Sequence, residues 1–299
     1  MKERVTILGG HGLVGSRFVE LFPHNNLLQA PTHREVDITN IQTIADCLKR
    51  YNSSVVINFA AYTKVDGAQE QKSQGEEGDA WKINVLGAEN VARVAANSGV
   101  FLIHISTDFV FPGTEENPGP YSEDSPPAKK AEEIGWYGWT KLKGEEKVKE
   151  VGGRHCIVRI SYPYRAKYEG KVDFARNILL LFDQGKLWPQ FTDQTMTPSF
   201  IDEVCKVLIL LSERKLDGIY HVGSSNTTNC FEFAKRLLKK ARGATGVVKP
   251  GLMEAYLKGS GVAPRPRLGG FKSKKTQEVL GVSYNSWEED QDDFIRQLK

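Results

Sequence analysis

Apolar and polar positions along the first 160 residues follow two alternating patterns. Short apolar runs rich in β-branched residues are typical of buried parallel strands. These runs lie at residues 5–8, 26–30, 54–59, 101–106 and 155–160. Between them, apolar residues recur every three to four positions, as on one face of a helix. This helical spacing covers residues 13–22, 40–51, 81–98 and 134–151. The alternation predicts an α/β Rossmann fold with a doubly wound parallel sheet.

After about residue 160 the alternation of strand and helix patterns becomes less regular. Helical spacing continues at residues 173–184, 200–212, 229–240 and 287–298, with a strand at 218–222. We therefore expect residues 1–160 to form an NAD(P)-binding Rossmann domain. Residues 161–299 would mainly form a smaller carboxyl-terminal substrate lobe, with some segments returning to the first domain. Residues 112–127 hold five prolines and are expected to be an irregular loop.

Composition narrows the class of protein. The chain has 299 residues, 40% of them hydrophobic, and a net charge of +3, so neither nucleic acid nor a membrane is an expected partner. No apolar run reaches about 18 residues, and the early strand leaves no room for a signal peptide. The four cysteines are far apart and the histidines lack metal-ligand spacing. We expect no disulfide, no metal and a cytoplasmic location.

A glycine-rich loop follows the first strand. Gly9, Gly12 and Gly15 are spaced three apart, and His11, Leu13 and Val14 complete the loop. Glycine permits the tight turn and lets backbone N–H groups approach a pyrophosphate at the amino end of the next helix. A glycine-rich turn without a ligand is the alternative. The strand before the loop and the helix after it favour a dinucleotide site.

Arg34 lies just after the second strand, where a Rossmann domain meets the adenosine ribose. Its guanidinium could pair with the 2′-phosphate of NADPH in a bidentate way, assisted by His11. The alternative is a solvated surface arginine. We expect NADPH to be the cofactor, with NADH also usable.

Tyr137 and Lys141 are four residues apart and share one face of the helix at 134–151. Reduction of a carbonyl needs a proton donor, and a free tyrosine has a pKa of about 10. Lowering it by about three units requires roughly 4 kcal/mol, which two positive charges, a nearby ammonium and the oxidised nicotinamide, could supply in a dry cleft. Thr107, at the end of the strand at 101–106, could hydrogen-bond the substrate carbonyl. The alternatives are a core aromatic residue, a solvated lysine and a turn threonine.

Together these stretches resemble an extended short-chain dehydrogenase/reductase and, within that superfamily, the dTDP-4-dehydrorhamnose reductases. The matching stretches are residues 7–15, 36–39, 56–66, 84–85, 106–111, 137–145, 193–194, 197–198 and 265–266. Each is moderately specific, whereas their order and spacing along nearly the whole chain are highly specific.

The resemblance implies roles for individual residues. Thr107, Tyr137 and Lys141 would be catalytic, with Lys141 also holding the nicotinamide ribose. The cofactor site would be lined by Gly9, Gly12, Gly15, Asp37, Ile38, Ala60, Ala61 and Tyr62. The nucleotide sugar would contact Thr107, Asp108, Phe109, Tyr137, Tyr162 and Arg265. The reaction would reduce the C4 ketone of dTDP-4-dehydro-L-rhamnose to dTDP-L-rhamnose, for polysaccharide biosynthesis.

Two other functions stay open. The chain also resembles the regulatory subunit of methionine adenosyltransferase, for which the cofactor would be structural, although the complete set of catalytic residues disfavours this. A reductase or epimerase of another nucleotide sugar is the third reading. Residues 71–79 and 129–136 look longer than is usual in the family and leave the exact sugar open. A homodimer is common for this architecture, but the sequence does not establish the oligomeric state.

Overall fold

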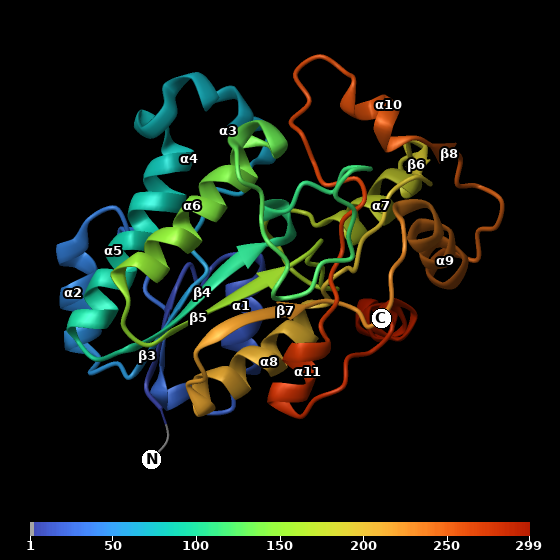
Figure 1. The fold of residues 1–299 in the computed structure, drawn as a ribbon. Helices are drawn as coiled ribbons and strands as arrows, with labels where there is room; N and C mark the ends of the chain where they lie inside the picture. Colours follow the sequence, from blue (N-terminus) through green and yellow to red (C-terminus); the bar gives the residue numbers. More distant parts are fainter. Residues whose placement is uncertain (1–2) are drawn as a thin grey trace.

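The computed structural model describes residues 3–299 and contains a six-stranded sheet in the order β2-β1-β3-β4-β5-β7 (Figure 1). All neighbouring strands are parallel. The strands are β1 (Val5–Leu8), β2 (Leu28–Gln29), β3 (Val55–Asn58), β4 (Phe101–Thr107), β5 (His155–Ile160) and β7 (Gly218–Val222). Strands β1, β3 and β4 are buried at every position, which explains their unbroken apolar runs. The predicted Rossmann fold is therefore confirmed.

Helices cover both faces of this sheet (Figure 1). One face carries α2 (Ile41–Arg50), α5 (Ala88–Asn97) and α6 (Trp136–Val151). The other carries α1 (Leu13–Leu21), α8 (Ile201–Arg214) and α11 (Lys274–Leu280). Each helix turns an apolar stripe inward, with Phe18 of α1 and Ile44 of α2 fully buried. The two cores hold the sheet rigid and fix the positions of its carboxyl ends.

The remaining segments pack as a lobe beyond those carboxyl ends. Helices α7 (Phe174–Asp183), α9 (Cys230–Arg242) and α12 (Trp287–Leu298) surround a separate core. Tyr164 lies in this core, with aromatic contacts to Phe174, Phe200, Phe233 and Phe294. A two-stranded sheet of β6 (Gln190–Phe191) and β8 (Pro250–Gly251) and the short α10 (Met253–Leu257) lie at its edge.

The chain returns to the main sheet after residue 160. Strand β7 pairs with β5, from Cys156 opposite Gly218 to Ile160 opposite Val222. Helix α8 packs against α1 on the sheet face. We retain a boundary near residue 160 as a proposal, with residues 201–222 and 274–280 assigned to the Rossmann domain.

Several elements differ from their predicted form. The helix predicted at 81–98 is divided into α4 (Asp79–Trp81), a π-helical turn (Lys82–Gly87) and α5. Residues 71–79, which look longer than usual in the family, include a 3-10 turn (Lys72–Glu77) after α3 (Val65–Glu70).

The second strand is also shorter than predicted, because a 3-10 turn (Asn25–Leu27) takes its first residues. Further 3-10 turns lie at Asp108–Val110 and Ala131–Glu133. None of the helices within residues 3–299 combines the length and apolar character needed to cross a membrane. The expectation about a signal peptide rests partly on residues 1–2, which lie outside the described residues.

Candidate active site

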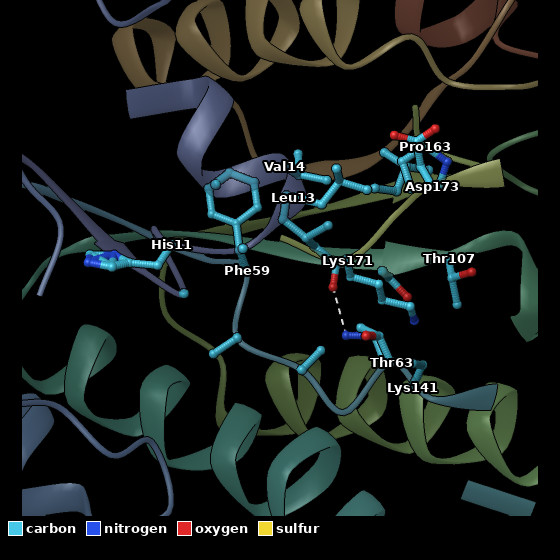
Figure 2. A pocket seen from close by; sticks show the side chains of 18 of the residues that line it. His11, Leu13, Val14, Phe59, Thr63, Thr107, Lys141, Pro163, Lys171 and Asp173 are labelled. Atoms are coloured by element: carbon cyan, nitrogen blue, oxygen red, sulfur yellow. Dashed lines mark hydrogen bonds between the residues drawn. The ribbon is translucent and has the colours of Figure 1, made fainter. Parts of the chain in front are cut away.

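A cavity of about 1020 Å³ opens at the carboxyl ends of the strands. A small-molecule site usually has about 300–1,000 Å³, so this cavity lies at the upper end of that range. Figure 2 shows it as elongated, with His11 toward one end and Thr107 and Lys141 toward the other. Segments from both the Rossmann half and the second lobe line it. They comprise residues 9–15, 31–34, 59–61, 63, 65, 105–109, 137, 141, 160, 162–163, 168, 171–174 and 265.

The glycine loop is shaped by close backbone contacts. Gly9 has φ +80°, and a Cβ on it would lie 2.7 Å from the backbone nitrogen of Ala60. A Cβ on Gly15 would lie 2.5 Å from the carbonyl oxygen of Gly9. Glycine is therefore required here to bring Ala60 and Ala61 beside the loop. No side chain caps the first turn of α1, so its N–H groups remain available to a pyrophosphate, and the loop fits a dinucleotide.

Basic side chains from the glycine loop and from the segment after β2 also line the cavity. His11, His33 and Arg34 line it, and the Arg34 side chain has no hydrogen-bond or ion-pair partner within residues 3–299. The carboxylate of neighbouring Glu35 instead accepts hydrogen bonds from the backbone and hydroxyl of Thr32, at 2.7 and 2.9 Å. This arrangement leaves the Arg34 guanidinium available to a 2′-phosphate.

Three residues expected at the cofactor site do not line this cavity. Asp37 accepts hydrogen bonds from the backbone and hydroxyl of Thr39. Ile38 is buried against Gly87, and the Tyr62 hydroxyl accepts a hydrogen bond from Gln71. Their contact with the cofactor stays a prediction. Their local packing explains their positions without a ligand.

Helix α6 brings Tyr137 and Lys141 to the end of β4. Gly138 allows this approach, because a Cβ there would collide with the carbonyl oxygen of Phe109. The Tyr137 ring meets the Phe109 ring edge-on, with centroids 5.5 Å apart. One turn later, the buried Nζ of Lys141 donates to the carbonyl oxygen of Ile105 at 2.7 Å. Tyr137, Lys141 and Thr107 thus line one cavity, which fits the helical spacing of the first two and the place of Thr107 at a strand end.

Burial is the largest cause of the pKa shifts of Tyr137 and Lys141. It raises the pKa of Tyr137 to about 12, assisted by the Asp108 carboxylate and opposed by a hydrogen bond with Thr107. It also lowers the pKa of Lys141 to about 8, opposed by the Glu145 carboxylate. The lowered tyrosine pKa was expected with the oxidised nicotinamide in place and stays a prediction for that state; without the cofactor, burial shifts the pKa upward because it disfavours the phenolate. Tyr137 therefore holds its proton at neutral pH.

Thr107 and Asp108 are fixed by their own hydrogen bonds. The Thr107 hydroxyl donates to Asp108 at 3.2 Å and accepts from the backbone N–H of Phe109 at 3.3 Å. Asp108 also accepts from the Ser161 hydroxyl at 2.6 Å. Burial still raises the pKa of Asp108 to about 6. This carboxyl group therefore changes charge just below neutral pH.

Two further predicted substrate residues line the cavity on the side of the second lobe. Tyr162 has φ +45°, and its hydroxyl accepts a hydrogen bond from Gln194 Nε2 at 2.5 Å. The other amide atom, Gln194 Oε1, is buried and has no hydrogen-bond partner among residues 3–299. Arg265 forms a bidentate ion pair with Asp66, at 2.9 and 2.8 Å, so its charge is partly neutralised.

The residue patterns did not identify a role for Asn84, whose side chain links two segments of the site. This buried side chain accepts from the Tyr62 backbone N–H at 2.8 Å and donates to the Thr140 hydroxyl at 2.9 Å. It lies in the π-helical turn and joins the loop after β3 to helix α6. An asparagine within an otherwise apolar helical stretch was the available signal. Such turns are frequent at functional sites.

A buried ion pair beneath Lys141 was also missed. Arg159 of β5 donates to both carboxylate oxygens of Glu145, at 2.8 and 2.6 Å, and both side chains are at most 1% exposed. Glu145 lies one helical turn after Lys141, which was the signal in the sequence. Within residues 3–299, no group of acidic, histidine or cysteine side chains gathers in a form that could hold a metal ion.

Known proteins resemble this chain along nearly its whole length. Residues 3–299 match the family model described as the RmlD substrate binding domain. The probable low-salt glycan biosynthesis reductase Agl14 of Haloferax volcanii is 31% identical, covering 94% of this chain and 88% of that protein. The dTDP-4-dehydrorhamnose reductase of Escherichia coli K12 is 27% identical, covering 95% and 94%.

The solved structures agree. The dTDP-4-dehydrorhamnose reductase of Bacillus anthracis in complex with NADP is 31% identical and superposes with a TM-score of 0.86, covering 99% of this chain and all of that one. The Clostridium acetobutylicum dTDP-4-dehydrorhamnose reductase gives a TM-score of 0.83 at 26% identity, covering 98% and 99%. The resemblance inferred from the sequence motifs is confirmed: the chain belongs to the RmlD substrate-binding-domain family, together with the dTDP-4-dehydrorhamnose reductases.

Proposed function

We propose that this protein is an NADPH-dependent reductase of the C4 ketone of a nucleotide-linked 4-keto-6-deoxy sugar. Its most fitting substrate is dTDP-4-dehydro-L-rhamnose, reduced to dTDP-L-rhamnose. The observation that carries the proposal is that Thr107, Tyr137 and Lys141 share one cavity with the glycine loop. Relatives named dTDP-4-dehydrorhamnose reductase support the reaction type, and the NADP-bound relative supports the cofactor.

The residues present fit this cofactor. The glycine loop and the first turn of α1 would hold its pyrophosphate, and Arg34 its 2′-phosphate. Lys141 would hold the nicotinamide ribose. When bound, the cofactor supplies a hydride to the C4 carbon of the sugar. The second lobe would orient the nucleotide sugar through Tyr162 and Arg265.

The chain's own side chains complete the reduction. When substrate binds, the Thr107 hydroxyl would turn its one hydrogen from Asp108 to the C4 carbonyl oxygen and polarise it. Tyr137 is protonated at neutral pH and would transfer its hydroxyl proton to that oxygen as negative charge develops. The resulting tyrosinate is stabilised by the Lys141 ammonium one turn along α6. Asp108 and Phe109 would position the sugar beside these groups.

A panel of 4-keto nucleotide sugars tests this function. Purified protein is mixed with NADPH or NADH and with dTDP-, UDP- or GDP-linked 4-keto-6-deoxy sugars, and cofactor oxidation is followed at 340 nm. We expect the dTDP sugar with NADPH to give the highest kcat/KM. Turnover of only UDP or GDP sugars would overturn the substrate assignment. Cofactor binding with no turnover of any sugar would favour a binding protein instead.

We also propose a cytoplasmic role in polysaccharide biosynthesis. All four cysteines are free, which suits a reducing compartment. We propose a homodimer as the working assembly because closed dimers are the commonest form of soluble oligomers. Light scattering on the purified protein distinguishes a mass near 33.4 kDa from twice that value.

A further inference from the structure

Residues 162–173, here called the strap, pass from the end of β5 into the second lobe and cover one side of the cavity. Two of its side chains bind the segment that carries the glycine loop. The Tyr168 hydroxyl donates to the carbonyl oxygen of His11 at 2.8 Å. Arg165 donates to the Ser16 hydroxyl at 3.0 Å and pairs with Glu20 at 2.6 Å. The strap is therefore attached to the half of the site that would hold the cofactor.

The far end of the strap is also fixed. Arg176 of α7 donates to the Asp173 carboxylate at 2.7 Å and to the carbonyl oxygen of Lys171 at 2.9 Å. Gly170 lies directly against the Tyr168 ring, where an added Cβ would come within 2.6 Å of the ring carbons. These contacts hold the backbone of Lys171 in place at the cavity wall.

The side chain of Lys171 lines the cavity without a partner. Its Nζ makes no hydrogen bond or ion pair with any side chain between residues 3 and 299. The two carboxylates in the same wall are already engaged, Asp108 by Ser161 and Asp173 by Arg176. In Figure 2, Lys171 extends between the His11 end and the end marked by Thr107. A free ammonium at this position attracts an anion rather than a neutral sugar ring.

We propose that Lys171 is a diphosphate-binding residue, held over the cavity by the strap and closing on the phosphates of a bound nucleotide. This inference rests on the proposed function, because it assumes that a nucleotide enters the cavity. Both the cofactor pyrophosphate and the diphosphate of the nucleotide sugar have the required chemistry. The attachment of the strap to His11, Ser16 and Glu20 makes the cofactor pyrophosphate the expected source.

Charge removal at Lys171 tests the proposal. Lys171→Met keeps the length of the side chain without its charge, and Lys171→Arg restores a cation. Lys167→Met is the matched control, since Lys167 is exposed in the same strap, as Lys171 is, but does not line the cavity. By fluorescence titration, Lys171→Met should weaken NADPH binding about tenfold, equal to about 1.4 kcal/mol. Lys171→Arg should recover most of this loss, and the control should bind like the wild type.

Ligand fragments identify the phosphate that is bound. ADP-ribose contains the cofactor pyrophosphate, 2′-AMP contains only the adenosine 2′-phosphate, and dTDP contains the sugar-nucleotide diphosphate. Weaker binding of ADP-ribose by Lys171→Met supports the cofactor source, and weaker binding of dTDP alone supports the sugar nucleotide. Unchanged binding of both overturns the proposal, as does an equal loss for 2′-AMP.

These titrations are independent of turnover. A protein that binds ADP-ribose through Lys171 but reduces no 4-keto sugar would reject the proposed function and leave this inference intact. Tyr168→Phe provides a second variant, because it removes the hydrogen bond to His11 without touching Lys171. We expect faster NADPH dissociation in stopped-flow measurements. An unchanged dissociation rate would show that the strap does not hold the cofactor.

Discussion

At the scale of single residues, the half-buried Tyr137 and the buried Lys141 line the same cavity and have pKa values displaced in opposite directions. The pKa of Tyr137 rises to about 12 and that of Lys141 falls to about 8. Both shifts have the same cause, since burial disfavours the charged form of each group. At neutral pH the pair therefore consists of a neutral phenol and an ammonium, the forms that suit reduction rather than oxidation.

Tyr137→Phe should abolish turnover. It removes the hydroxyl that would give its proton to the sugar oxygen but keeps the ring that packs against Phe109. We expect kcat to fall by about 100-fold or more, while the Kd for NADPH stays within about twofold of the wild type. Steady-state kinetics and fluorescence titration measure the two quantities. Substantial retained activity would reject Tyr137 as the proton donor.

Activity should decline at alkaline pH. Lys141 loses its proton as the pH rises through about 8 and then no longer stabilises tyrosinate, while Tyr137 keeps its own proton up to about 12. The kcat/KM for sugar reduction should therefore fall above pH 8. A profile from pH 6 to 10 in a constant-ionic-strength buffer measures this. A flat profile up to pH 10 would contradict the assignment.

Arg34→Ala should change cofactor choice. Loss of the guanidinium should raise the KM for NADPH about tenfold or more, because a charge-assisted bidentate contact with a phosphate contributes at least about 1.5 kcal/mol. The KM for NADH, which lacks that phosphate, should stay nearly constant. The neighbouring Arg50→Ala, outside the cavity, serves as a control. Equal effects on both cofactors would exclude a contact with the 2′-phosphate.

Much of the candidate site was predictable because its residues lie in local motifs. The spacing of Gly9, Gly12 and Gly15 and the four-residue step from Tyr137 to Lys141 depend only on neighbouring positions. The direction of the Tyr137 pKa shift was not predictable, since it depends on burial by distant segments. Lys171 was not predicted for a similar reason. The strap contains no recognisable motif, and only the fold brings Lys171 to the cavity.

At the scale of elements, helix α6 is anchored to the sheet by a buried charge pair. Glu145, one turn after Lys141, is held by Arg159 of β5, and Arg159 also lies over the ring of Phe111. Arg159 holds the pKa of Glu145 down to about 2, although burial alone would raise it. The pair therefore fixes helix α6 to β5 and places a carboxylate one turn after Lys141.

Arg159→Met should destabilise the protein by about 3–5 kcal/mol, because it leaves the Glu145 carboxylate buried without a partner. The double variant Glu145→Met with Arg159→Met should recover much of this loss, since a buried pair is often replaceable by apolar residues. Urea unfolding at pH 7 measures both. Equal stability of the single and double variants would contradict this account.

The Glu145–Arg159 pair also predicts how the free energy of unfolding changes at acid pH. The folded-state pKa of Glu145 is lowered from 4.5 to about 2, so its stabilisation is complete above pH 4.5 and is lost as the pH falls toward 2. The difference in stability between the wild type and the double variant should shrink over that window.

Elements with strong periodicity were predicted well, and interrupted ones were not. The strands β1, β5 and β7 and the helix α12 have the predicted bounds, because each combines an apolar pattern with a clear stop. The π-helical turn at Lys82–Gly87 was not predictable from spacing. It is associated with tertiary contacts, in which Asn84 bonds to Thr140 and Gly87 packs on Ile38.

At the scale of the whole molecule, the cavity is formed by segments from both halves of the chain. Cofactor binding should therefore stabilise the Rossmann half and the second lobe together. At 100 times its Kd, NADPH should add about 2.7 kcal/mol to the free energy of unfolding. We expect a single urea unfolding transition. NADPH should move its midpoint to higher urea by the same amount in far-UV circular dichroism and in tryptophan fluorescence. Two separate transitions, with only one displaced by NADPH, would show that the lobes are independent.

The pairing of β7 with β5 has a consequence for synthesis on the ribosome. A nascent chain that has emerged only to residue 200 can form β1 to β5, but the outer edge of β5 still lacks its neighbour. An open strand edge of this kind invites pairing with other chains. The growing polypeptide should therefore be most vulnerable to aggregation, and most dependent on chaperones, between the exit of β5 and the exit of Val222.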